Sequence, residues 1–269
     1  MSLLRIEFRK MLHARSFWVL SALYLLSMAV VFYFLQEYVI RKVQLNGDLD
    51  KMVFSHFHIY NFPDIWNNLA YVCSFFFVFP SIMVIIFTTN EFSYRTIRQH
   101  IIDGMSRDAF ILSKAMTVTI FSVVSTFFLF VLGLVIGFAN TPDAVLVDCF
   151  EGMHYLGLYL IQMLIYLMFA LACSLLLKRS GLTIGLFLIY SWFGERILEA
   201  ILPGSIGKYL PLNSADNLVP FPFTKYFEVL LEDGKTLPTP TGGVDLVVAM
   251  LWLAVLGAGA WLWVRKQDL

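Results

Sequence analysis

Three ionisable residues stand near the end of the apolar stretch 182–202, and they are Glu195, Arg196 and Glu199. Glu195 and Glu199 are one helical turn apart and would share one face of a helix. Because an ionisable group inside a membrane helix is costly, it is usually functional or paired. The three could line a substrate path, bind a cation, pair with a neighbouring helix or lie among lipid head groups, where long side chains reach water. We favour a structural or gating role.

The rest of the sequence does not assemble a catalytic or metal-binding site. It has neither a G-x-S-x-G nucleophile motif nor an H-E-x-x-H zinc motif. His154, at the start of a predicted span, is the one histidine that could approach the two glutamates. The three cysteines are far apart, as is typical of small buried residues rather than of a disulfide framework. We therefore expect that the chain is not itself an enzyme and holds no metal.

One segment resembles the end of a phosphate-binding loop. Gly234, Lys235 and Thr236 follow one another as in that loop, but Val229 replaces the first glycine of the motif. We expect no nucleotide site on this chain, which therefore cannot supply its own ATP energy.

The composition is typical of a membrane protein. Hydrophobic residues make up 59% of the 269 residues, charged residues make up 14%, and the mean hydropathy is +0.76. This is more apolar surface than a soluble core can bury. The formal net charge is zero, which leaves no basic field to attract a nucleic acid. The lipid bilayer is the expected environment.

A helix needs about 20 mostly apolar residues to cross a bilayer. Six stretches meet this requirement, at 17–36, 66–89, 115–139, 154–177, 182–202 and 245–264. The sequence therefore predicts an all-α integral membrane protein with six transmembrane helices in a single transmembrane domain over residues 1–269. The first stretch is too long for a signal peptide and lacks a small-residue cleavage site, so we expect it to be retained.

Lysine and arginine gather on one predicted side of the membrane. That side holds the basic residues of 1–15, 90–114, 178–179 and 265–266, whereas the loop 141–152 on the other side has none. By the positive-inside rule, both termini are expected in the cytoplasm.

The segment 1–15 predicts an amphipathic helix that lies on the inner membrane surface. Its apolar face is formed by Leu4, Phe8, Met11 and Leu12. The basic residues that lie largely away from this face are Arg5, Arg9, Lys10 and His13. The alternative is an ordinary basic flank before the first span.

The segment 90–114 predicts a compact cytoplasmic knob between the second and third spans. A helix over 91–102 would carry Phe92, Ile97 and Ile101 among polar positions. Gly104 could end it in a left-handed conformation, and Ser106 would cap the next helix. Arg107 and Lys114 are expected to remain near the membrane surface.

The segment 203–243 holds six of the nine prolines and precedes the last span. Its apolar pieces are too short to cross the bilayer. We predict an outer cap, either partly re-entrant or a solvated loop.

The segment 90–114 resembles the cytoplasmic connection of ABC-2-type ABC transporter permeases. In that family a glutamate ends the second span, a threonine follows, and a Ser-Arg pair and a lysine begin the third span. The corresponding residues here are Glu91, Thr96, Ser106, Arg107 and Lys114. The chain departs from the family at Arg95, where many members have glycine, and at Met105, where proline is common.

The first residues are also similar to the amphipathic entry helix of that family. Lys10, Arg15, Ser16 and Trp18 match its approach to the first span. Six spans with both ends inside extend the resemblance over nearly the whole chain.

The resemblance implies a permease subunit of an ATP-driven exporter in a prokaryotic inner membrane. A second permease subunit, identical or related, would complete the path. Separate cytoplasmic ATPase subunits would hold ATP and Mg, and this chain would bind no cofactor. The path would be lined by spans one, two and five and closed outside by 203–243.

The segment 91–102 would be the coupling helix that docks on the ATPase. The implied docking and coupling residues are Glu91, Phe92, Arg95, Thr96, Ile97, Arg98, Ser106, Arg107 and Lys114. Arg95 and Arg98 would meet acidic residues, while Phe92 and Ile97 would fill the groove of the ATPase.

Two other function classes stay open. In a secondary transporter the carboxylates of 182–202 would carry protons, and an intramembrane enzyme would use Glu195, Glu199 and His154. An ABC architecture could also serve signalling or membrane remodelling. The mostly apolar, aromatic lining favours an amphipathic substrate, with sodium export as an alternative.

Overall fold

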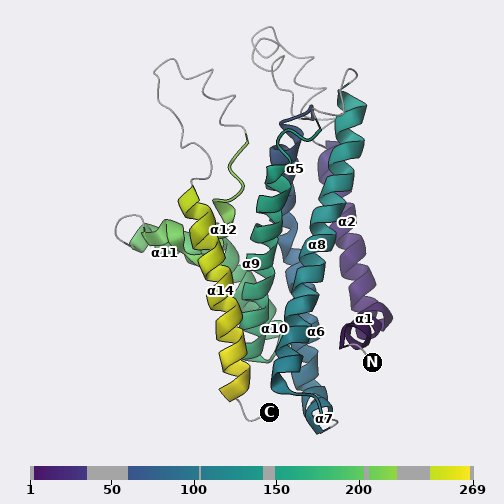
Figure 1. Ribbon diagram of the computed structural model, residues 1–269, viewed down its shortest axis with the longest axis vertical. Helices are drawn as coiled ribbons and strands as arrows, with labels where there is room; N and C mark the ends of the chain where they lie inside the picture. The colour runs from purple at the N-terminus through teal and green to yellow at the C-terminus, as the bar shows by residue number, and fades with distance from the viewer. Residues whose placement is uncertain are drawn as a thin grey trace.

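The computed structural model describes residues 3–34, 60–102, 104–141, 149–202, 206–222 and 243–266. Every regular element within these ranges is helical, and most of the helices run lengthwise in one bundle (Figure 1). The elements at the amino-terminal half are α1 (Leu3–His13), α2 (Arg15–Phe34), α5 (Ile65–Ser74), η2 (Phe75–Phe77), α6 (Val78–Ser93), α7 (Thr96–Ile102) and α8 (Arg107–Asn140). The remaining elements are α9 (His154–Leu177), α10 (Ser180–Ile189), η3 (Tyr190–Gly194), α11 (Glu195–Ile201), η4 (Ile206–Tyr209), α12 (Pro211–Asp216) and α14 (Gly243–Lys266).

Five segments of the described chain are long and apolar enough to cross a membrane. They are Arg15–Phe34, Ile65–Ser93, Arg107–Asn140, His154–Leu177 and Gly243–Lys266. These five match five of the six predicted spans, so the chain is an all-helical, multi-pass membrane protein. The second of them contains a short 3₁₀ turn, η2, between α5 and α6.

Helix α9 forms the centre of the bundle, where it contacts α5, α6, α8, α12 and α14. Tyr159, Ile165 and Leu171 on α9 are completely buried. Helix α2, in contrast, buries only the stripe of Tyr24, Met28 and Phe32 and exposes most of its other apolar side chains. A helix that is apolar all round and buried on one side is what a lipid-facing position requires.

Helix α8 approaches α5 closely because it presents glycine there. A side chain at Gly133 or Gly137 would overlap the rings of Trp66 and Phe62. Trp66 is fully buried, stacks on Phe130 and donates its indole N–H to the Cys149 carbonyl at 2.9 Å. This contact fixes the bundle at the end away from α7.

The predicted span 182–202 is not one continuous α-helix. Helix α10 runs along α9, the π-helical turn η3 interrupts it, and α11 lies across the bundle (Figure 1). A π turn widens the helix by one residue and commonly accompanies a change of direction.

The predicted cap 203–243 lies partly outside the described residues. Its described part contains η4 and α12, which pack against α11, α9 and α14. Leu212, Ala215, Leu218 and Val219 are buried there. This part is packed into the bundle and is not a solvated loop.

The first described residues of α1, the short α7 and the end of α14 lie at the same end of the bundle (Figure 1). Helix α1 lies across the start of α2 and contacts α8. The helix predicted at the amino-terminal end is therefore present, at the same end as the predicted knob.

Candidate functional site

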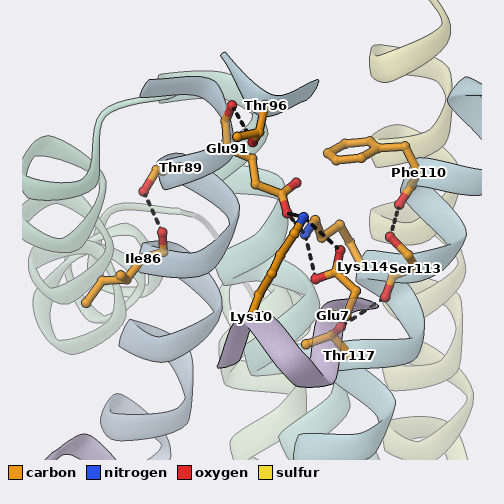
Figure 2. Close-up of polar contacts among 10 residues, drawn as sticks. All are labelled: Glu7, Lys10, Ile86, Thr89, Glu91, Thr96, Phe110, Ser113, Lys114 and Thr117. Carbon is orange, nitrogen blue, oxygen red and sulfur yellow. Dashed lines mark hydrogen bonds and ion pairs between the residues drawn. The ribbon is translucent and has the colours of Figure 1, made fainter. Parts of the chain in front are cut away.

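Four charged side chains from three helices meet beside α7, and we call them the Glu91 cluster: Glu7, Lys10, Glu91 and Lys114. Lys114 Nζ lies 2.7 Å from Glu91 Oε1 and 2.9 Å from Glu7 Oε2 (Figure 2). Lys10 Nζ lies 3.1 Å from Glu91 Oε1 and 4.0 Å from Glu7 Oε1. The two ammonium groups balance the two carboxylates, so the cluster has no net charge.

The cluster is largely closed to solvent. Lys114 is 3% exposed, Glu91 6% and Glu7 7%. Lys10 is half-buried at the open side. A charge buried without a partner costs several kcal/mol, so each of the buried three depends on the others. The ion pairs therefore hold α1, α6 and α8 together at this point.

Helix α1 brings Glu7 and Lys10 to the cluster because they share a face with Met11, which is buried. Phe8 and Leu12 remain 40% and 46% exposed on the side open to lipid. Lys10, which was predicted to lie largely away from the apolar face of 1–15, is half-buried and contacts Glu91, and the role of Glu7 was missed. The available signal was that Glu7 is the one acidic residue among the basic residues of 1–15.

Helix α8 supplies Lys114 two turns after its first residue. Lys114, which was expected near the membrane surface, is buried, and its ammonium group reaches inward to both carboxylates. The neighbouring hydroxyls of Ser113 and Thr117 donate to carbonyls of the preceding turn, at Phe110 and Ser113 (Figure 2). The hydrogen bonds of these two hydroxyls are therefore made within α8, and neither hydroxyl competes with Lys114 for the carboxylates.

Helix α6 supplies Glu91 at its last turn, immediately before α7. The Thr96 hydroxyl donates to the Glu91 backbone carbonyl at 3.3 Å and so joins the start of α7 to the residue that carries the cluster (Figure 2). The predicted continuous helix 91–102 is wrong in its middle, because α6 ends at Ser93 and α7 begins at Thr96.

Arg95 produces this break. Its φ is +56°, a left-handed conformation that glycine adopts more readily than any residue with a Cβ. This is the position at which the sequence departs from the glycine of the resembling family. The turn keeps its local geometry because Arg95 N–H donates to the Phe92 carbonyl at 3.2 Å.

The other end of α7 agrees with the prediction. Gly104 has a φ of +94°, and the Ser106 side chain accepts a hydrogen bond from the Ala109 N–H at 3.1 Å. Gly104 therefore reverses the chain and Ser106 caps α8, as expected from the sequence.

The apolar residues predicted to dock on a partner are not the exposed ones. Ile97 is 3% exposed and packs with Val84 and Phe110 inside the chain. Phe92 is half-buried, with Lys178 Nζ 5.5 Å from its ring centre. Among the described side chains, α7 and the preceding turn expose Tyr94 at 76%, Ile102 at 84%, Arg95 and Gln99. The side chain of Arg98 lies outside the described residues.

The start of α8 is also joined to the end of α14. Arg107 Nη1 donates to the Arg265 carbonyl at 2.7 Å, and the Arg265 guanidinium donates twice to the Asp108 carboxylate, at 3.0 and 2.9 Å. This ion pair is half-exposed. Arg107 thus holds α14 in place and is only partly free for a partner.

Away from the Glu91 cluster, Glu195 on α11 has a structural role. Its carboxylate accepts the backbone N–H groups of Leu212 and Asn213 at 3.0 and 2.6 Å, which are the free donors at the start of α12. Glu199 accepts a hydrogen bond from the Asn213 side chain at 3.3 Å. These contacts join α11 to α12 and favour the structural interpretation of the two glutamates.

Arg196 is exposed and lines a cavity of about 340 Å³ between α5, η2, α9, η3 and α12. Asp216 lies in the same cavity and accepts hydrogen bonds from the Tyr166 hydroxyl and from Gln162 Nε2. Burial raises the pKa of Asp216, while the Tyr166 hydrogen bond and the nearby Arg196 charge oppose that rise.

A second cavity of about 410 Å³ is lined by α1, α2, α6 and α8 and is almost entirely apolar. Among the residues that the structure describes, no group of three or more His, Cys, Asp or Glu side chains is placed to hold a metal ion.

A family model described as "Protein of unknown function (DUF2705)" matches residues 29–269. The matched range contains Glu91 and Lys114 of the cluster and Gln162 and Asp216 of the cavity. Glu7 and Lys10 precede it. No curated protein matches the chain.

Proposed function

The chain belongs to the DUF2705 family, whose function is unknown, and we propose that it is the membrane-spanning permease subunit of an ATP-driven exporter. Its partners would be cytoplasmic ATPase subunits that carry ATP and Mg, and a second permease subunit, identical or related. It would reside in a prokaryotic inner membrane with both termini in the cytoplasm.

The observation that carries the proposal is the Glu91 cluster beside α7. Glu91 lies in the last turn of α6, only two residues separate α6 from α7, and the Thr96 hydroxyl of α7 donates to the Glu91 carbonyl. A force on α7 would therefore reach Glu91, and Lys114 would transmit it to α8 and to Glu7 on α1. Ion pairs with partners on three helices suit this task because they move as one packed unit.

A six-span topology supports the assignment. The described ends of α1 and α14 lie at the same end of the bundle (Figure 1), which requires an even number of crossings. Five continuous candidate spans are odd in number. The broken segment α10–η3–α11 would supply the sixth crossing and lead into the cap that contains α12.

The proposed docking surface is formed by Tyr94, Arg95 and Ile102. Tyr94 and Ile102 expose large apolar side chains where the chain leaves the bundle, and exposed aromatic and aliphatic anchors of this kind fill pockets on partners. Arg95 adds a positive charge beside them. Glu91 and Lys114 would act behind this surface and would not touch the ATPase.

Co-purification tests the docking surface. The tagged chain would be extracted from native membranes in mild detergent, and nucleotide-binding subunits in the eluate would be identified and assayed for ATP hydrolysis. Ile102→Ser should remove most of the bound subunit. The matched control is Phe150→Ser, because Phe150 is a 70% exposed apolar residue outside the α7 region.

A wild-type chain that elutes without any ATPase subunit would contradict the proposed function. Equal recovery of the subunit with both variants would instead contradict the docking surface alone.

A further inference from the structure

The 340 Å³ cavity has the size and lining of a binding site for a small organic molecule. Its walls are mainly aromatic, from Tyr71, Phe75, Phe77, Tyr166 and Trp192. Phe77 stacks on Tyr166 with ring centres 4.0 Å apart, which makes one wall rigid. Electron-rich aromatic faces of this kind attract the apolar body of a ligand and also an organic cation.

The cavity holds a buried acceptor without a donor. Gln162 is 1% exposed, and its Oε1 has no hydrogen-bond partner among the described residues. Its Nε2 donates to Asp216 Oδ1 at 3.4 Å, which leaves the oxygen as the free atom of the amide. A buried acceptor without a donor is unfavourable, so a ligand that donates a hydrogen bond there gains affinity by relieving it.

Asp216 is the second acceptor. Asp216 is exposed and lines the cavity, and the Tyr166 hydroxyl and the Gln162 amide both donate to the same oxygen, Oδ1. These two donors fix the orientation of the carboxylate. The Arg196 side chain is long and exposed, so water can solvate its guanidinium group.

We propose that this cavity binds the protonated amino group of an amphipathic amine. The ammonium donates to Gln162 Oε1 and to the Asp216 carboxylate, and the aromatic walls enclose the apolar part of the molecule. Under the proposed function this amine is the exported substrate, and in that respect the inference rests on it. The binding itself requires neither ATP nor a partner.

Fluorescence titration of the purified chain in lipid nanodiscs tests the site. The probe is dansylcadaverine, which joins an aromatic ring to a primary ammonium. Its matched controls are N-butyl dansylamide, which has no charge, and dansylglycine, which has a carboxylate. We expect saturable binding of dansylcadaverine and at least about tenfold weaker binding of both controls, since they lack the charged donor.

Variants then locate the binding. Asp216→Asn should weaken dansylcadaverine binding about tenfold and Gln162→Leu about fivefold, because each removes one acceptor. Gln162→Glu, which adds a second carboxylate, should strengthen it. Asp108→Asn removes a carboxylate in the first turn of α8, outside the cavity, and should leave the affinity unchanged. Each variant would first be required to elute as the wild type does on gel filtration, and if Asp216→Asn does not, the two Gln162 variants decide.

Equal binding of dansylcadaverine and N-butyl dansylamide would overturn the proposal, as would unchanged affinity in the Gln162 and Asp216 variants. Preferential binding of dansylglycine that is lost in Arg196→Met would show an anion site instead. None of these results depends on an ATPase subunit, so failure here and failure of the exporter assignment are distinguishable.

Discussion

Two regions of the molecule, the Glu91 cluster and the cavity between α5, α9 and α12, hold their charged groups in different ways. In the Glu91 cluster two lysines and two glutamates neutralise one another, and Lys114 and Glu7 are closed to solvent. In the cavity, the exposed Asp216 and Arg196 line an open volume beside a buried acceptor of Gln162 that has no donor. A closed cluster of paired charges holds helices together, whereas a cavity has room for a ligand. On this comparison, the cluster suits the force transmission that we propose, and the cavity suits the recognition that we propose.

The largest effect is expected when the cluster loses its central cation. Lys114→Met leaves Glu7 and Glu91 buried without their main partner and should lower the stability of the chain by about 3–5 kcal/mol. Adding Glu91→Gln to this variant should recover part of the loss, because one uncompensated charge is removed. Thermal unfolding in detergent measures both changes.

Lys178→Met is the control for that experiment. It removes a lysine at the same end, whose ammonium group lies 5.5 Å from the centre of the Phe92 ring. Its loss should be small, about 0.5–1 kcal/mol. If Lys114→Met were no more destabilising than Lys178→Met, the cluster would not hold the three helices.

A smaller effect is expected where Glu195 caps α12. Glu195→Ala removes an ionised acceptor from two backbone N–H groups and should cost about 2–3 kcal/mol. Glu199→Ala removes one long contact to the Asn213 side chain at a more exposed position and should cost less. The unfolding midpoints of the two variants, compared in the same detergent, check this order. A reversed order would return Glu195 to the path-lining role considered from the sequence.

The smallest expected effect is a gain in the stability of the folded chain. Arg95→Gly places glycine where φ is +56° and should stabilise the folded chain by up to about 1 kcal/mol, partly offset by the greater freedom of glycine when unfolded. Gln99→Gly, inside α7, should instead destabilise by about 1 kcal/mol. Differential scanning calorimetry of both variants would detect the opposite signs of the change in stability. A loss of stability in both variants would mean that Arg95 is not strained.

Much of the fold follows from local sequence. The five continuous spans arise from apolar runs of sufficient length, and Gly104 and Ser106 act through the conformational freedom of glycine and the capping oxygen of serine. These are properties of single residues and their neighbours. The break in the predicted span 182–202 was not visible, because a π turn in an apolar run leaves no distinct residue signal.

The candidate site was only partly predictable. Glu91 and Lys114 were singled out by resemblance, but their burial with Glu7 depends on how α1 packs on α8, which no local pattern states. Ile97 has the same apolar character as Ile102, yet one is buried and the other exposed, because residues five apart lie on different faces of α7 and the tertiary packing decides which face is covered. Gln162 and Asp216 were missed because 54 residues separate them, and a lone glutamine in an apolar helix is the signal that was available.

The central claim is that the Glu91 cluster couples α7 to the membrane helices of an ATP-driven exporter. The most direct test is ATP hydrolysis by the complex co-purified from native membranes, with the wild type and with Glu91→Gln, normalised to the amount of ATPase subunit recovered. The account predicts that the subunit co-purifies with both chains, because Glu91 lies behind the docking surface, and that hydrolysis per subunit falls several-fold in the variant. Wild-type hydrolysis by the Glu91→Gln complex, with the subunit fully retained, would contradict it.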